Sequence, residues 1–220
     1  MDWSRIVDGY CERVGTDPNF WGEPLNAVTN IAFILAALWA LALARREGRL
    51  DWSVVALAGI VLAVGIGSFL FHTFATPWAG AMDVIPIQIF ILVYFAVVLI
   101  RAYQLQWFWS ALAALAFLPC AAGFGWLVQG TVLGGANAGY SAALLLLVGN
   151  AAILGVRGHR LAGWLAAGAG LFTVSLLFRI IDEPVCGVFP YGTHFLWHLL
   201  NGTLMGLLLT GMVREGAREP

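Results

Sequence analysis

The chain has 220 residues, of which 61% are hydrophobic and only 10% are charged, and its mean hydropathy is +0.86. Soluble domains carry about a quarter charged residues, so a chain this apolar is excluded as a soluble protein. The formal net charge of −1 and the lack of a basic patch interleaved with aromatic residues exclude a typical nucleic-acid-binding protein. The composition predicts an integral membrane protein.

Seven apolar runs are long enough to cross a bilayer, because a spanning helix needs about 20 mostly apolar residues. The runs cover residues 25–44, 53–73, 81–100, 107–127, 137–156, 161–180 and 193–213. The connections between them are short, which predicts that consecutive helices are antiparallel neighbours. We therefore expect an all-α polytopic membrane protein in which residues 1–220 form a single seven-helix domain.

The placement of arginine predicts the orientation, because cytoplasmic loops carry an excess of basic residues. The N-terminal side of the seven runs has three arginines, whereas the opposite side has eight: Arg45, Arg46, Arg49, Arg101, Arg157, Arg160, Arg214 and Arg218. We therefore expect an extracytoplasmic N-terminal segment over residues 1–24 and a cytoplasmic C-terminus. All basic residues are arginines in a chain rich in alanine and glycine, a bias typical of a GC-rich coding sequence. This bias points to a bacterial source, so we expect the membrane to be a bacterial cell membrane.

Three histidines converge on the extracytoplasmic end of this predicted bundle. His72 lies in the last turns of the second run, and His194 and His198 lie in the first two turns of the seventh. His194 and His198 are four residues apart and share one helix face. Three neutral imidazoles with an open fourth position are typical of a catalytic zinc site. A hydrogen-bonded polar cluster or a proton relay is the alternative.

Two further polar residues lie at the same depth and could serve catalysis. Phe195 follows the first histidine where soluble metalloproteases have a glutamate, so the general base must come from elsewhere. Asp83, expected in the first turn of the third run, is the acid at this depth, although an acid there could also be favoured by the helix dipole alone. Ser68 lies one turn before His72 and could reach a metal-bound oxygen, or it could bond back to its own helix.

The extracytoplasmic segment predicts a second cation site and a cross-link. The acids Asp8, Glu12, Asp17 and Glu23 lie within sixteen residues, and such clusters can bind calcium through oxygen ligands; an acidic solvated cap is the alternative. Cys11 and Cys186 both fall on the oxidising side of the membrane, where a disulfide between them is plausible.

Several spaced motifs together resemble the signature of the alkaline ceramidases, which share a superfamily with the adiponectin and progestin receptors. The motifs are Ser68-x-x-x-His72, Asp83-x-x-Pro86 and His194-x-x-x-His198, with Asp182 and Cys186 before the last run and Glu23-x-x-Asn26-x-x-x-Asn30 at the first. Taken in order over seven spans, they cover nearly the whole chain.

The resemblance implies a seven-helix bundle with zinc held by His72, His194 and His198. It also implies that Asp83 binds the zinc water and that Ser68 assists. A calcium site in the N-terminal segment would map to Glu12 and Glu23, although Gly9 and Tyr10 stand where the family has aspartate and tryptophan. A disulfide between Cys11 and Cys186 is consistent with the family.

The activity implied by this resemblance is zinc-dependent hydrolysis of the amide bond in ceramide or a related N-acyl lipid, which releases an amine base and a fatty acid. The partners are then the membrane lipid substrate and the bilayer, with no protein partner implied. The receptor branch of the superfamily suggests an alternative, a seven-helix lipid receptor that contains zinc but does not turn over its ligand.

Overall fold

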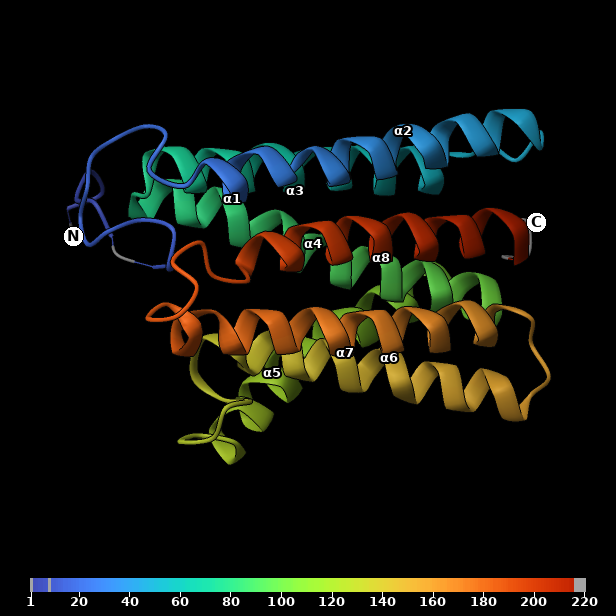
Figure 1. The fold of residues 1–220 in the computed structure, drawn as a ribbon. Coiled ribbons are helices and arrows are strands. Elements are labelled where there is room, and N and C mark those ends of the chain that lie inside the picture. Colours follow the sequence, from blue (N-terminus) through green and yellow to red (C-terminus); the bar gives the residue numbers. More distant parts are fainter. Residues whose placement is uncertain (1, 8, 216–220) are drawn as a thin grey trace.

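The computed structural model describes residues 2–7 and 9–215, which are all-helical apart from their connecting loops (Figure 1). The helices are α1 (Pro24–Thr29), α2 (Ile31–Arg46), α3 (Trp52–Phe74), α4 (Pro77–Ala102), α5 (Trp107–Leu127), the short 3₁₀ turn η1 (Gly135–Asn137), α6 (Ala138–Val156), α7 (Leu161–Val185) and α8 (His194–Glu215). Long helices that follow one another in the chain run antiparallel, whereas α2 and α8, which pack together, run parallel.

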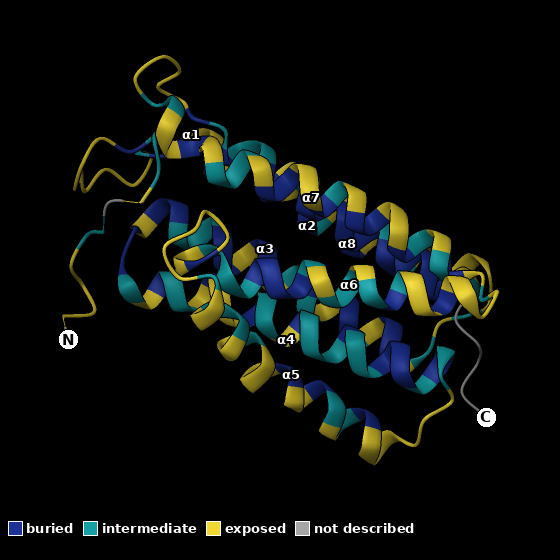
Figure 2. Ribbon diagram, turned by 90° about the horizontal axis from the view of Figure 1, so that it is seen from below, coloured by how far each residue is buried: buried dark blue, intermediate teal, exposed yellow. Residues whose placement is uncertain are grey.

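The described residues form seven segments long and apolar enough to span a membrane, with α1 and α2 together making the first and η1 joining α6 in the fifth. This confirms the predicted number of spans and the all-α fold. Helices dominate because a backbone in lipid must satisfy its own hydrogen bonds. Exposed residues recur along the helices (Figure 2). The exposed large apolar residues include Leu35, Trp39 and Ile66, as expected for a surface in contact with lipid.

Helix α8 lies at the centre of the bundle, where it packs against α2, α3 and α7. In its most apolar stretch 72% of the residues are buried, against 17% for the peripheral α5. Small residues allow the close approach of α2, since a Cβ at Gly202 or Gly206 would meet Ala32 or Ala36. This small-xxx-small spacing is a common device for packing helices in membranes. The helix that carries two of the histidines is therefore the most deeply buried of the seven spans.

One predicted boundary is wrong in a way that matters for the site. The third span begins at Pro77 rather than at residue 81, so Asp83 lies in the second turn of α4 and not in its first. Pro77 starts the helix early because proline at the first helical position loses no hydrogen bond and has its φ preset. Asp83 is therefore beyond the first turn, where the helix dipole acts most strongly, and the dipole alone does not explain it.

The end of the bundle opposite the N-terminal segment is held by an ion pair between two helices. The Asp51 carboxylate accepts bonds from the Ser53 and Val54 amides at the start of α3, and its other oxygen lies 2.5 Å from Nη2 of the buried Arg101 on α4. Partial burial would raise the pKa of Asp51, but the bonds from the Val54 amide and from Arg101 lower it below its usual value. Asp51 thus caps α3 and fastens it to α4.

Candidate metal centre

The three predicted histidines meet at the end of the bundle that carries the N-terminal segment. His72 comes from the last turn of α3, and His194 and His198 come from the first two turns of α8. All three are about 99% buried, and their ligand nitrogens lie within 4.8 Å of one another. Helix spacing places the pair on α8, and the packing of α3 against α8 adds the third imidazole. The three side chains could share one metal ion.

Hydrogen bonds to the far ring nitrogens orient two of these imidazoles. Nδ1 of His72 lies 2.5 Å from the Glu23 carboxylate, so it carries the proton and leaves Nε2 free. Nδ1 of His198 lies 3.1 Å from the Thr29 hydroxyl, which already donates to the Leu25 carbonyl, so Nδ1 donates here too. Partners of this kind fix the tautomer of metal-bound histidines in known sites.

Two of the ring nitrogens that would face a metal have no hydrogen-bond partner among the described residues, and the third, Nε2 of His198, lies 3.5 Å from the Ser68 hydroxyl. Nε2 of His72 and Nδ1 of His194 are buried and have no hydrogen-bond partner among residues 2–7 and 9–215. Buried polar atoms without partners are rare in native proteins and need an explanation. A bound metal ion supplies one, and three imidazoles are a zinc-type donor set. The residues present therefore fit the implied zinc.

His194 is positioned by the end of α7 and by the N-terminal segment. Oδ1 of the Asp182 carboxylate accepts hydrogen bonds from the Thr193 and His194 amides at 2.6 and 2.8 Å and so caps the start of α8. The Tyr10 ring stacks on the His194 imidazole with centroids 3.7 Å apart. The predicted disulfide between Cys11 and Cys186 is confirmed. It holds the neighbouring residue Tyr10 in place.

Asp83 and Ser68 face each other across the interface of α3 and α4. Both are buried, and the Asp83 carboxyl group lies within interaction range of Ser68 and His72. The Ser68 hydroxyl is also 3.5 Å from Nε2 of His198. The helices approach closely because Gly67 has no Cβ to meet the Met82 carbonyl, which lacks its usual helical partner since Pro86 has no N–H. The acid and the hydroxyl thus lie beside the histidines.

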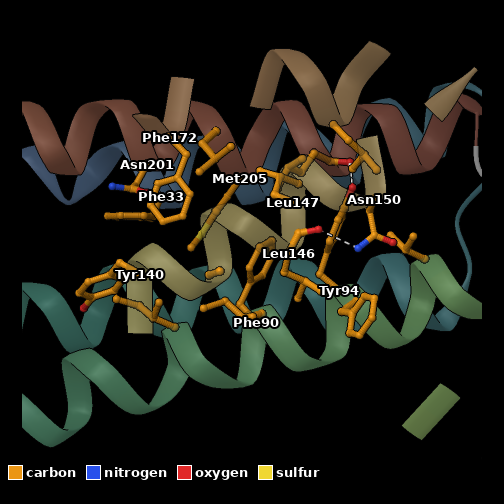
Figure 3. Close-up of a pocket in the computed structure, with 18 of the residues that line it drawn as sticks. Phe33, Phe90, Tyr94, Tyr140, Leu146, Leu147, Asn150, Phe172, Asn201 and Met205 are labelled. Carbon is orange, nitrogen blue, oxygen red and sulfur yellow. Dashed lines mark hydrogen bonds between the residues drawn. The ribbon is translucent and has the colours of Figure 1, made fainter. Parts of the chain in front are cut away.

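An apolar cavity lies inside the bundle (Figure 3), and the ring of Trp197, one of its lining residues, is 6.3 Å from that of His194. Its volume is about 90 Å³, and it is partly open to the outside. Tyr140 and Asn201 lie toward one end of the cavity and Tyr94 and Asn150 toward the other (Figure 3), and the Trp197 ring packs against Tyr140 with centroids 4.9 Å apart. Lining residues come from α2, α4, α6, α7 and α8 but not from α5. A single extended hydrocarbon chain suits such a space.

A sequence comparison joins these features to a known family, because the Ceramidase family model matches residues 8–215, most of the chain. The chain belongs to the ceramidase family. A search among curated proteins found no match. Membership in the ceramidase family implies a hydrolase that acts on an amide in a lipid substrate, and the three histidines of this ceramidase-family chain could hold a metal ion.

Glu12 and Glu23, two of the acids predicted to bind calcium, are already engaged in hydrogen bonds. Both oxygens of Glu12 accept backbone amides at the start of α1, from Leu25 and Asn26. Burial would raise the pKa of Glu23, but its bonds with His72 and Arg13 lower it overall. Asp17 is exposed, and Asp8 lies outside the described residues. The calcium site stays a prediction, and the structure offers it no free carboxylate oxygen on Glu12 or Glu23.

Sequence reasoning missed two residues that lie at the site. The Arg179 guanidinium donates to the Tyr10 hydroxyl at 2.9 Å and lies 5.1 and 5.4 Å from the ring centres of Tyr140 and Trp197, two residues that line the cavity. Arg13 reaches Glu23 and the end of α3. Both arginines served only to predict orientation, yet an arginine within an apolar run such as Arg179 signals a functional position.

Proposed function

We propose that this protein is a zinc-dependent hydrolase that cleaves the amide bond of ceramide or a related N-acyl lipid. One observation carries the proposal: three buried histidines, two of them with an unpartnered ring nitrogen, lie beside Asp83 and Ser68, and the His194 ring is 6.3 Å from that of Trp197, which lines an apolar cavity. Catalytic zinc sites combine such a ligand set with an open position, a nearby acid and a shaped cavity.

The histidines are the proposed zinc ligands. His72 and His198 would bind through Nε2, since each engages Nδ1 in a hydrogen bond to Glu23 or Thr29. His194 would complete the set, held by the Asp182 cap. Zinc bound here supplies a Lewis acid that polarises the amide carbonyl and lowers the pKa of water to about 7.

Asp83 is the proposed general base and acid. Its carboxylate accepts a proton from the attacking water as the water oxygen bonds to the amide carbon. It returns that proton to the nitrogen as the C–N bond breaks, so that water and amide become a fatty acid and an amine. Ser68 donates its hydroxyl proton in a hydrogen bond to the carbonyl oxygen as negative charge develops there, a contribution of about 3 kcal/mol for a donor of this type.

The cavity orients the substrate. Its apolar lining would take the acyl chain, and the polar head would remain among the loops of the N-terminal segment. Arg179, which forms no ion pair with an acid among the described residues, lies where the carboxylate of a fatty-acid product would emerge. Because the arginine excess lies at the other end, we propose that the site faces the extracytoplasmic side of a bacterial cell membrane.

The test is fatty-acid release from a ceramide mixture by detergent-purified protein, with zinc content measured on the same samples. The wild type should release fatty acid, whereas His198→Ala should lose both release and zinc. His159→Ala is the matched control, because His159 caps α7 at the opposite end of the bundle and should keep both. Full zinc in His198→Ala would refute the ligand assignment. Ligand binding without turnover by a zinc-loaded wild type would favour a receptor.

A further inference from the structure

Arg13 is a buried cation surrounded by oxygen atoms that come from three parts of the chain. Its side chain is 0% exposed. Nε donates to the Glu23 carboxylate at 2.9 Å, and Nη1 donates to the carbonyls of Asp17 and Asn19 at 2.6 and 3.0 Å. Nη2 donates to the carbonyls of His72 and Thr73 at 3.2 and 3.4 Å. A buried charge is tolerated only when it is paired and hydrogen-bonded, and this guanidinium is.

The two carbonyls at the end of α3 explain why a cation belongs here. The last carbonyls of a helix have no partner within the helix, and the negative end of the helix dipole favours a positive charge beside them. Gly22 keeps the space free, because a Cβ there would lie 2.6 and 2.8 Å from Nη1 and Cζ of Arg13. The chain is therefore built around the guanidinium.

The same oxygen set is the kind that calcium takes, which is six to eight carboxylate and carbonyl oxygens. In this protein one Glu23 oxygen is bound to Arg13, and the other is bound to His72 and Asn26. Both Glu12 oxygens are bound to amides of α1. A calcium ion could bind only by displacing the guanidinium or by breaking these bonds, so the residues present do not fit one.

We infer that the Arg13 guanidinium takes the place of a bound cation in the N-terminal segment, so that the segment is ordered and His72 is oriented without calcium. Arg13 is then a positioning residue: it holds Glu23, and Glu23 holds Nδ1 of His72. The loop, the start of α1 and the end of α3 are joined by a covalently attached charge. Ionic cross-links of this kind do not depend on the calcium concentration outside the cell.

The first test is calcium binding to the full-length wild type in detergent, in buffer freed of calcium by a chelating resin and with zinc supplied separately. Titration with calcium chloride to millimolar concentration, with magnesium chloride as the ionic control, should leave Tm unchanged and show no binding heat. Calcium-specific heat or a calcium-specific rise in Tm would overturn the inference. This result does not depend on whether the protein is a hydrolase.

The second test is zinc affinity, measured by competition with a chromophoric chelator well below Tm; this readout alone rests on the proposed zinc site. Arg13→Gln should bind zinc about 10- to 100-fold more weakly, the usual loss when an outer partner of a metal-bound histidine fails. The zinc affinity of Arg13→Lys should lie between those of the wild type and Arg13→Gln, because an ammonium group keeps the charge but cannot reproduce the planar fork of donors. The lysine variant carries the comparison if the glutamine variant does not fold.

Two controls separate positioning from general destabilisation. Arg5→Gln removes an exposed arginine of the same segment and should change neither Tm nor zinc affinity. Leu57→Ala opens the core far from the histidines on α3 and should lower Tm with little change in zinc affinity. Normal zinc affinity in an Arg13 variant would refute the positioning role. So would an Arg13 variant that binds zinc as tightly as Leu57→Ala when the two have lost the same amount of Tm. If the wild type itself binds no zinc, the proposed function fails while the calcium result stands.

Discussion

Gly67→Ala tests whether the close approach of α3 and α4 is what makes the candidate site competent. An ideal Cβ at residue 67 would lie 2.6 Å from the Met82 carbonyl carbon and even nearer its oxygen. Non-bonded carbons pack at about 3.5–4.0 Å, so the two helices must separate by about 1 Å. Because Ser68 and His72 lie on α3 and Asp83 lies on α4, the acid is displaced from the other groups.

The expected effect is large on turnover and small on stability. Overpacking costs about 1–3 kcal/mol, and replacing a helical glycine by alanine returns about 1 kcal/mol, so the net loss is about 0–2 kcal/mol. A misplacement of about 1 Å can cost about 10²-fold in rate. We therefore expect kcat for fatty-acid release to fall about 100-fold with Tm only slightly lowered. Zinc should be retained, because Asp83 is not a proposed ligand.

The assay compares kcat, Tm and zinc content with those of Gly59→Ala. Gly59 is on the same helix but has no neighbour within 4 Å of its ideal Cβ, so alanine there should leave kcat unchanged. Equal turnover by the two variants would refute the requirement for close approach. Loss of zinc from Gly67→Ala would show that the packing supports the histidines rather than Asp83.

Four further changes test other parts of the site and fold. Asp83→Asn should keep zinc but lose about 10²- to 10⁴-fold in kcat; full activity would remove Asp83 from the mechanism. Arg179→Gln should weaken inhibition by added fatty acid more than it changes the rate of release from ceramide. Inhibition equal to that of the wild type would refute a contact between Arg179 and the product carboxylate. Cys11→Ser should lower the free energy of unfolding by about 2–4 kcal/mol, because the disulfide closes a loop of 175 residues. Thiol titration of the non-reduced wild type should detect Cys120 alone. Asp51→Asn should be less stable than wild type by about 1 kcal/mol or less at pH 7, since the pair with Arg101 is partly exposed. The lowered pKa of Asp51 means that its contribution is full above the usual carboxyl pKa of about 3.9 and is lost as the pH falls through the lowered value. The Tm difference should therefore shrink as the pH is lowered below that range; a difference that stays constant would contradict this account.

Much of the fold could be predicted from the sequence, because a bilayer restricts both the type and the length of the secondary structure that can cross it. A backbone in hydrocarbon must form helices, and the required length makes each span visible as an apolar run. The fourth run, 107–127, coincides with α5, and the second run, 53–73, ends one residue short of α3 at each end. The boundary at Pro77 was missed because the residues after it, including Gly80, resemble a loop by composition alone.

Part of the candidate site was also readable. His194 and His198 lie four residues apart, as do Ser68 and His72, and the helix repeat places each pair on one face without any knowledge of packing. Alternation of the spans then brings the ends of α3 and α8 and the start of α4 to one end of the bundle. Depth in the membrane, which follows from counting residues along each helix, was enough to group these side chains.

The sequence alone determined the spans, the helix faces and the end of the bundle at which the polar residues gather, because these follow from local periodicity and from the solvent. Only the tertiary structure decided which partners they meet. Glu23 holds His72 across 49 positions of the chain and Cys11 meets Asp182 across 171, and no local pattern specifies contacts at such separations. Arg13 shows the difference most clearly: in the sequence it is one more basic residue, and in the fold it is the cation around which the N-terminal segment closes.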